Sequence, residues 1–335
     1  MAVLIPLVLI AVGIALLVGG ADVLVRGAAR LGRALGMSTF VIGVTIVAFG
    51  TSAPELFAGV RAATAGVGDL AVGAVLGSNV ANIGLVLGLT ALVRAVPVPQ
   101  PVRRFDVPVM WMVTLLASIA LLGDGVVTRV EGVLLAATLV VYVYFTYWAG
   151  KRDPESTAHE LEHEVEQTLH LETPDRGRAV LIDILLVLAG TVLLAGGAEL
   201  LVRGATTLAT DVLGVPVGVV GLSVVAFGTS LPELAAGLRA ALSRDPDMAV
   251  GNIVGSNVFN LLSVMGISAI VAPLDTRPGV GGDVLAMIVF AGLCYPVLSK
   301  RGLIGRPQGA LLLLAYLAYV IVVYAGAKAI SVPAG

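Results

Sequence analysis

Two nearly identical apolar segments of this 335-residue sequence each contain a carboxylate. The first segment, GVTIVAFGTSAPE, ends at Glu55, and the second, GLSVVAFGTSLPE, ends at Glu233. An ionisable side chain at bilayer depth costs about 2.5–3.5 kcal/mol on insertion scales, so an acid retained there is a candidate functional group. Glycine, serine, threonine and proline beside each acid can loosen a helix and free backbone carbonyls. The two segments therefore predict a cation site inside a membrane.

A second duplicated block adds neutral oxygen atoms. LAVGAVLGSNVAN occupies 70–82 and MAVGNIVGSNVFN occupies 248–260. Serine and glutamate three apart in the first block, and serine and asparagine four apart in the second, share a face if each segment is helical. Two carboxylates, four hydroxyls and two amides suit hard cations such as Ca²⁺ and Na⁺ better than Zn²⁺ or Cu⁺. The candidate side chains are Ser52, Glu55, Ser78, Asn82, Ser230, Glu233, Ser256 and Asn260.

Glycine and proline next to the acids predict locally unwound helices. Gly50 and Pro54 flank the first motif, and Gly228 and Pro232 flank the second. Helices broken at these residues would leave backbone carbonyls without helical partners, and such carbonyls can coordinate a cation. The carbonyls concerned belong to Ala48, Thr51, Ala226 and Thr229.

The composition is that of a polytopic membrane protein. Hydrophobic residues make up 58% of the chain, charged residues only 13%, and the mean hydropathy is +1.02, whereas soluble domains carry about 25% charged residues. A net charge of −2 and the absence of a basic patch argue against a nucleic-acid partner. The first apolar run lacks a positive leading region, so we interpret it as a span and not as a cleaved signal peptide. The single cysteine, Cys294, excludes an internal disulfide.

Apolar runs long enough to cross about 30 Å of hydrocarbon predict an all-α fold of ten transmembrane helices. The interval from Glu55 to Glu233 equals the interval from Asn82 to Asn260, so one five-helix unit occurs twice. An odd number of spans inverts the second copy, and inverted repeats with broken helices at a midplane site are typical of secondary transporters. We expect an N-terminal repeat at 1–149, a hydrophilic linker at 150–178 and a C-terminal repeat at 179–335. The predicted spans are 4–31, 38–65, 70–95, 105–123, 127–149, 179–208, 216–243, 247–273, 281–299 and 308–329.

The distribution of lysine and arginine predicts the orientation. With the N-terminus outside, fifteen of these side chains fall on the inside and five on the outside. Because cytoplasmic connections are enriched in lysine and arginine, both termini should lie outside and the linker in the cytoplasm. Two further acids, Asp22 and Glu199, each precede an arginine by four positions, Arg26 and Arg203, and we interpret both as interfacial ion pairs.

The paired GTSxPE and GSNxxN blocks resemble the two alpha-repeats of the sodium/calcium exchanger family, of the prokaryotic type, within the cation/calcium antiporters. The likeness covers nearly the whole chain. It implies Ca²⁺ bound by Glu55 and Glu233 with the carbonyls of Thr51 and Thr229. It also implies a Na⁺ site from Glu55, Ser78, Ser230 and the Ala226 carbonyl, and an inverted mate from Glu233, Ser256, Ser52 and the Ala48 carbonyl. Asn82 and Asn260 would line the middle.

The chain departs from the family at the middle positions. Many members carry aspartate at the position of Asn260, and potassium-dependent relatives tend to have acids at both middle positions. Two amides here imply no potassium coupling and a pocket whose two carboxylates match one Ca²⁺ or two Na⁺. Ala74 also stands where the second copy has Asn252.

The leading hypothesis is a secondary antiporter, not an enzyme, that exchanges Na⁺ for Ca²⁺ by alternating access. It needs no cofactor, and its partners are the two ions and membrane lipid, with no nucleic acid and with the monomer as the working unit. Exchange of Ca²⁺ for H⁺, or of other monovalent for divalent cations, is the alternative within transport, and a channel would need a continuous pore. From another class comes a membrane zinc hydrolase, because His159 to His163 fit HExxH; we interpret this polar segment as a solvated acidic helix.

Overall fold

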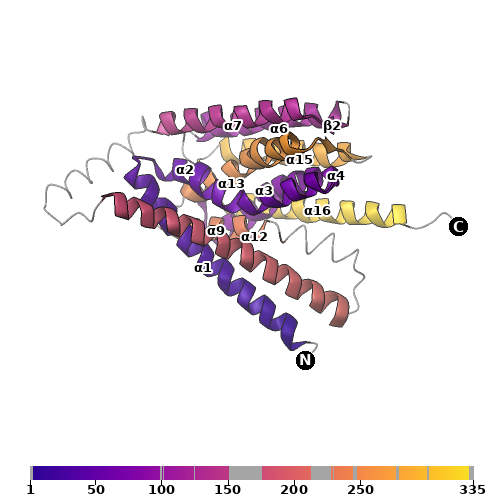
Figure 1. Cartoon of the computed structure of the whole chain (residues 1–335), viewed down its shortest axis with the longest axis horizontal. Helices are drawn as coiled ribbons and strands as arrows, with labels where there is room; N and C mark the ends of the chain where they lie inside the picture. The colour runs from indigo at the N-terminus through magenta and orange to yellow at the C-terminus, as the bar shows by residue number, and fades with distance from the viewer. Residues whose placement is uncertain are drawn as a thin grey trace.

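The computed structural model describes residues 3–98, 100, 102–123, 125–150, 176–212, 228, 230–243, 247–276, 279–299 and 302–331. These residues form long helices (Figure 1). Several of the helices contain π-helical turns, and there are four two-residue strands among the described residues. The first half contains α1 (Leu4–Ala34), α2 (Thr39–Ile42), η1 (Gly43–Val47), α3 (Ala48–Thr64), α4 (Gly68–Ala81), η2 (Asn82–Leu87), α5 (Gly88–Val93), β1 (Val96–Pro97), η3 (Val102–Asp106), α6 (Val107–Leu122), β2 (Val126–Val127) and α7 (Arg129–Gly150). The second half contains α9 (Arg176–Thr207), η4 (Leu208–Val212), α12 (Leu231–Leu242), α13 (Asp247–Phe259), η6 (Asn260–Val264), α14 (Met265–Val271), β3 (Leu274–Asp275), α15 (Val280–Ser299), β4 (Leu303–Ile304) and α16 (Arg306–Ser331).

The helical membrane fold expected from the sequence is confirmed. Eight helical stretches of the described residues are long and apolar enough to cross a membrane, and Val280–Cys294 is a shorter apolar helix. α12 is the described part of the expected span 216–243; residues 213–227 lie outside the description. Large apolar side chains of α1, α7, α9 and α16 are exposed, as expected for faces in contact with lipid.

Two short antiparallel strand pairs join the halves of the chain. β1 pairs with β4, matching Val96 to Ile304, and β2 pairs with β3, matching Val127 to Leu274. β3 is the counterpart of β1 in the second repeat, and β4 is the counterpart of β2. Exchanging each strand for its counterpart in the other repeat therefore turns the β1–β4 pair into the β3–β2 pair, as expected for a chain folded from two related units.

α1 and α9 pack against each other in opposite directions, and both cross the remaining helices obliquely (Figure 1). The interface is lined by glycine at every seventh position. A Cβ added at Gly20 would lie 2.9 Å from the Leu194 nitrogen, and one at Gly190 would lie 2.5 Å from the Leu24 nitrogen. Only glycine permits this approach of two backbones, since lipid offers no hydrophobic drive for association and close packing must supply it. The glycines are Gly13, Gly20 and Gly27 on α1, and Gly190, Gly197 and Gly204 on α9.

α13 lies at the centre of the molecule and packs against α2 and η1 of the other repeat. A Cβ at Gly251 would lie 2.6 Å from the Phe40 carbonyl oxygen, and one at Gly255 would lie 2.5 Å from the Val44 carbonyl oxygen. Glycine at these positions thus brings the second GSNxxN block against the segment that leads into the first GTSxPE motif.

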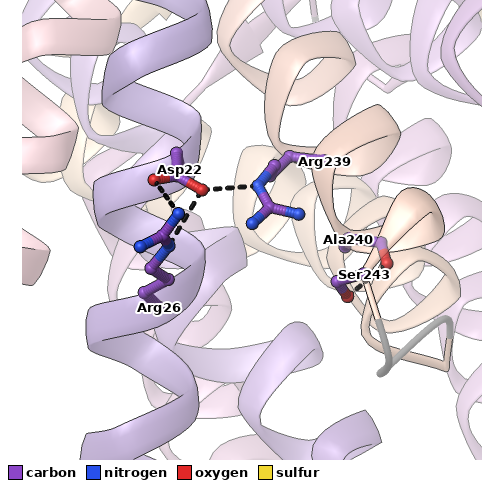
Figure 2. Close-up of polar contacts among 5 residues, drawn as sticks. All are labelled: Asp22, Arg26, Arg239, Ala240 and Ser243. Carbon is purple, nitrogen blue, oxygen red and sulfur yellow. Dashed lines mark hydrogen bonds and ion pairs between the residues drawn. The ribbon is translucent and has the colours of Figure 1, made fainter.

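Both expected ion pairs are present, and one extends between the repeats. Asp22 pairs with Arg26 at 2.8 Å, and Glu199 pairs with Arg203. Asp22 also accepts a hydrogen bond from Arg239 of α12 at 2.7 Å, so one carboxylate of α1 holds two guanidinium groups (Figure 2). Just beyond the end of α12, the Ser243 hydroxyl donates to the Ala240 carbonyl. The contact with Arg239 ties the α1–α9 pair to the helix that carries Glu233.

The α1–α9 interface offers a matched pair of substitutions. Gly197→Val should lower the apparent unfolding temperature in detergent, because its side chain meets the Leu17 nitrogen and the Gly13 carbonyl oxygen; overpacking costs about 1–3 kcal/mol. Gly196→Val is the control, since no atom lies within 4 Å of a Cβ at Gly196. Equal unfolding temperatures for the two variants would contradict the packing described here.

Candidate cation site

All the predicted site residues that the structure describes are buried. Their exposed fractions run from 0% to 7%, and the largest value belongs to Glu55. Thr229 and Ala226 lie outside the described residues. The buried set comprises Ala48, Thr51, Ser52, Glu55, Ser78, Asn82, Ser230, Glu233, Ser256 and Asn260.

Repeated π-helical turns position the middle amides. Asn82 is the first residue of η2, which follows α4, and Asn260 is the first residue of η6, which follows α13. π-helical turns insert an extra residue into a helix and are common at functional sites. Because the two turns begin at equivalent positions of the two repeats, each repeat uses the same local distortion to present an amide.

The helix break in the first repeat differs from the sequence expectation. Gly50 and Pro54 lie inside α3, which stays helical, and the distortion is the π-helical turn η1 that ends at Val47, just before Ala48. Proline removes only the hydrogen bond to the carbonyl four positions earlier, and the neighbouring helices hold the remaining turns. In the second repeat, α12 begins at Leu231 and Ser230 has non-helical dihedral angles, so a helix does start within that motif.

No described basic side chain forms a hydrogen bond or an ion pair with either carboxylate. Both oxygens of Glu55 and Oε2 of Glu233 have no hydrogen-bond partner among the described residues. Oε1 of Glu233 accepts a long hydrogen bond, 3.5 Å, from the Ser52 hydroxyl of the other repeat. Ser52 lies one helical turn before Glu55 in α3, so its contact with Glu233 brings the two acids to the same site. Buried like charges without partners are strongly unfavourable, and a bound cation would remove this penalty.

Neutral oxygen atoms accompany the acids. The side-chain oxygens and nitrogens of Asn82 and Asn260 are buried and have no hydrogen-bond partner within the described parts of the chain, and the same holds for the Ser230 hydroxyl. Buried polar atoms are normally paired, so several unpaired ones beside two acids indicate a site built to bind something. Amide and hydroxyl oxygens complete the coordination of Ca²⁺ or Na⁺ without adding charge.

A hydroxyl network links the two repeats at this site. The Thr51 hydroxyl lies 3.3 Å from the Ser256 hydroxyl, 3.2 Å from the Asn252 side-chain oxygen and 3.2 Å from the Ala48 carbonyl oxygen. Asn252 also donates from Nδ2 to the Glu233 carbonyl oxygen at 3.4 Å. The sequence prediction did not include Asn252 in the site. The available signal was its replacement by Ala74 in the otherwise matching block of the first repeat.

This donor set fits hard cations. Within the described ranges, no three residues among histidine, cysteine, aspartate and glutamate gather as metal ligands. The site instead combines two carboxylates with neutral oxygens, the ligand types that Ca²⁺ and Na⁺ accept. The histidines of the HExxH segment, His159 and His163, lie outside the described residues.

Comparison with known proteins gives consistent similarities along the chain. The sodium/calcium exchanger protein family matches residues 5–148 and 182–325. The chain is 37% identical over 321 residues to CaxA, a putative antiporter of Alkalimonas amylolytica, covering 94% of this chain and 98% of that one. It is 27% identical over 343 residues to the sodium/calcium exchanger MaX1 of Methanosarcina acetivorans, covering 93% and 96%. The solved structure of the sodium-calcium exchanger NCX_Mj, soaked with Na⁺ and without Ca²⁺, superposes with a TM-score of 0.78 at 28% identity, covering 95% and 99%.

Neutralising a site carboxylate should affect stability in two opposite ways. Glu233→Gln should raise the apparent unfolding temperature in a buffer free of Na⁺ and of divalent cations, because it removes a buried charge beside Glu55. The same variant should lose most of the stabilisation by Ca²⁺, which for a site at one hundred times its Kd amounts to about 2.7 kcal/mol.

Asp22→Asn is the control for this experiment. Asp22 is paired with two arginines, so its neutralisation should lower the unfolding temperature and leave the Ca²⁺ increment intact. An unchanged Ca²⁺ increment in Glu233→Gln would exclude Glu233 from the cation site.

Proposed function

The chain belongs to the sodium/calcium exchanger protein family, and we propose that it exchanges Na⁺ for Ca²⁺ as a secondary antiporter. It is an integral membrane protein of a family of cation/calcium antiporters. The observation that carries the narrower proposal is the pair of buried acids, Glu55 and Glu233, one from each repeat and neither with a counter-charge among the described residues. The names of the Methanosarcina acetivorans relative and of NCX_Mj support Na⁺ and Ca²⁺ as the two exchanged ions.

The charge of the site provides a basis for exchange. Two carboxylates are neutralised by one Ca²⁺ or by two Na⁺, so each ion species can displace the other while a third Na⁺ would leave the pocket positive. Because the empty pocket is unfavourable, the protein should change the side to which the site is exposed only with an ion bound. This requirement couples the Na⁺ flux to the Ca²⁺ flux. The repeats at 1–149 and 179–335 would expose the site to one side at a time, with 150–178 as the linker between them.

We assign Ca²⁺ to Glu55, Glu233 and the carbonyls of Thr51 and Thr229. One Na⁺ site would use Glu233, Ser52, Ser256 and the Ala48 carbonyl. The hydrogen bond from Ser52 to Glu233 supports this grouping, because it brings ligands of both repeats together. The inverted site would use Glu55, Ser78, Ser230 and the Ala226 carbonyl.

The middle of the site is neutral. Asn82 and Asn260 offer amide oxygens and add no charge, so we propose that K⁺ is not transported with Ca²⁺. A third or fourth acid would be needed to balance an additional cation.

The distribution of arginine and lysine supports one membrane orientation. We propose a cell-membrane protein with both termini outside and the linker in the cytoplasm. Its surroundings are lipid, and the complete set of ligands in one chain supports a monomer as the transporting unit.

Flux measurements in proteoliposomes test the proposed exchange. An outward Na⁺ gradient should drive ⁴⁵Ca²⁺ uptake by the wild-type protein, and addition of K⁺ should not increase the rate. Glu55→Gln and Glu233→Gln should each abolish uptake, since a dehydrated divalent ion loses both a ligand and a charge. Uptake driven by a pH gradient and insensitive to Na⁺ would favour proton exchange and overturn the proposal.

Ser230→Ala should weaken Na⁺ binding more than Ca²⁺ binding. The Ser230 hydroxyl is assigned to a Na⁺ site only, so its removal should raise the half-saturating Na⁺ concentration several-fold and spare Ca²⁺ self-exchange. Ser118→Ala is the matched control, because Ser118 is also buried and donates to the Thr114 carbonyl within α6. Equal loss of both activities in Ser230→Ala would indicate a purely structural serine.

A further inference from the structure

A hydroxyl can bind a cation only through its oxygen lone pairs, so its proton must point elsewhere. Ser256 is assigned to a Na⁺ site, and its hydroxyl forms a 3.3 Å hydrogen bond with the Thr51 hydroxyl. Ser256 is fully buried, and the Thr51 hydroxyl lies within hydrogen-bond distance of it. The arrangement that leaves the Ser256 lone pairs for a cation has Ser256 donating to Thr51.

Thr51 has a single proton and more than one acceptor nearby. The Ala48 carbonyl oxygen and the Asn252 side-chain oxygen both lie 3.2 Å from its hydroxyl, and the Glu233 carboxylate is also close to it. The Ala48 carbonyl and the carboxylate are assigned to the Na⁺ site, and a proton donated to either would weaken it as a cation ligand. A proton donated to Asn252 leaves both available.

The amide of Asn252 can face only one way. Its Nδ2 lies 3.4 Å from the Glu233 carbonyl oxygen, which can accept a hydrogen bond but cannot donate one. The nitrogen must therefore face Glu233, and the oxygen must face Thr51. The result is a chain of donors in one direction, from Ser256 to Thr51, then to Asn252, and from Asn252 to the Glu233 backbone.

From this geometry we propose that Asn252 is a positioning residue that sets Na⁺ affinity by accepting a hydrogen bond from the Thr51 hydroxyl. The inference deepens the proposed function and rests on it. Asn252 touches no transported ion; it turns the protons of Thr51 and Ser256 away from the ligand atoms of Ser256 and Ala48. The corresponding residue of the first repeat is Ala74, which has no acceptor in its side chain. The two repeats therefore do not offer Na⁺ equivalent environments.

Loss of the Asn252 acceptor should affect Na⁺ binding and Ca²⁺ binding differently. Ala48 and Ser256 are assigned to Na⁺ and not to Ca²⁺, so loss of the Asn252 acceptor should change the Na⁺ affinity selectively. Loss of the hydrogen bond to the Glu233 backbone would instead shift the affinities for both ions together. The ratio of the two affinities is thus a measure of the proton-directing role.

Binding measured without transport tests the inference. The apparent unfolding temperature of the full-length protein in detergent is followed against Na⁺ alone and against Ca²⁺ alone, which gives two half-saturating concentrations. In Asn252→Ala the Na⁺ value should rise about fivefold relative to the Ca²⁺ value, the effect expected from one hydrogen bond. Asn257→Ala is the matched control, a buried asparagine of the same helix that donates to the Ile253 carbonyl. It should leave the ratio unchanged.

A double substitution makes the test specific. Thr51→Val removes the hydroxyl that accepts the hydrogen bond from Ser256 and donates one to Asn252, so this substitution should itself weaken Na⁺ binding. Adding Asn252→Ala to Thr51→Val should then change the Na⁺ to Ca²⁺ ratio no further, because the chain of donors is already interrupted. Additive effects would overturn the proposal. If Asn252→Ala does not fold, the selective loss of Na⁺ affinity in Thr51→Val tests the same chain.

The outcomes distinguish the inference from the function on which it rests. If the wild-type protein is stabilised by neither Na⁺ nor Ca²⁺, the proposed function fails and the inference fails with it. If the wild-type protein binds both ions and Asn252→Ala keeps its ratio of affinities, only the inference is overturned.

Discussion

The structure depends on one costly arrangement, the burial of two carboxylates within a membrane protein, with no basic side chain among the described residues to balance them. Glu55 and Glu233 come from different repeats, and the described residues around them supply hydroxyls, amides and backbone carbonyls but no cationic group. Two buried carboxylates without counter-charge are unfavourable, and cations of total charge two would neutralise them. The same constraint explains the neutral surroundings, since further acids would increase the repulsion and basic groups would compete with the ions.

The remaining architecture keeps two inverted units close enough to share this site. Glycines at every seventh position bring α1 and α9 into backbone contact, and Gly251 and Gly255 bring α13 against α2 and η1. Short strand pairs connect the repeats, and Asp22 links α1 to α12 through Arg239. Because these elements pack on the other repeat, side chains as distant in sequence as Ser52 and Glu233 become neighbours.

Much of this could be predicted from the sequence because the chain contains two copies of the same unit, which can be compared with each other. The internal repeat identified the acids, serines and amides, and the odd number of spans implied inversion. The π-helical turns were not predictable, since neither η1 nor the helical turn α2 that precedes it contains a proline. Asn252 was missed because its role depends on a threonine of the other repeat, Thr51. Comparison of the two repeats identifies residues that both contain, and Asn252 has no equivalent in the first repeat, where Ala74 takes its place.

Equilibrium binding of ⁴⁵Ca²⁺ to the purified protein at increasing Na⁺ concentration tests the central claim, that one pair of carboxylates serves both ions. We predict a single bound Ca²⁺ per chain. Na⁺ should raise the apparent Kd for Ca²⁺ without limit and more steeply than in direct proportion, because at least two Na⁺ replace each Ca²⁺. Saturation of the Na⁺ effect at a finite Kd would show that both ions bind at once. That result, or a capacity of two Ca²⁺ per chain, would contradict a shared site at Glu55 and Glu233.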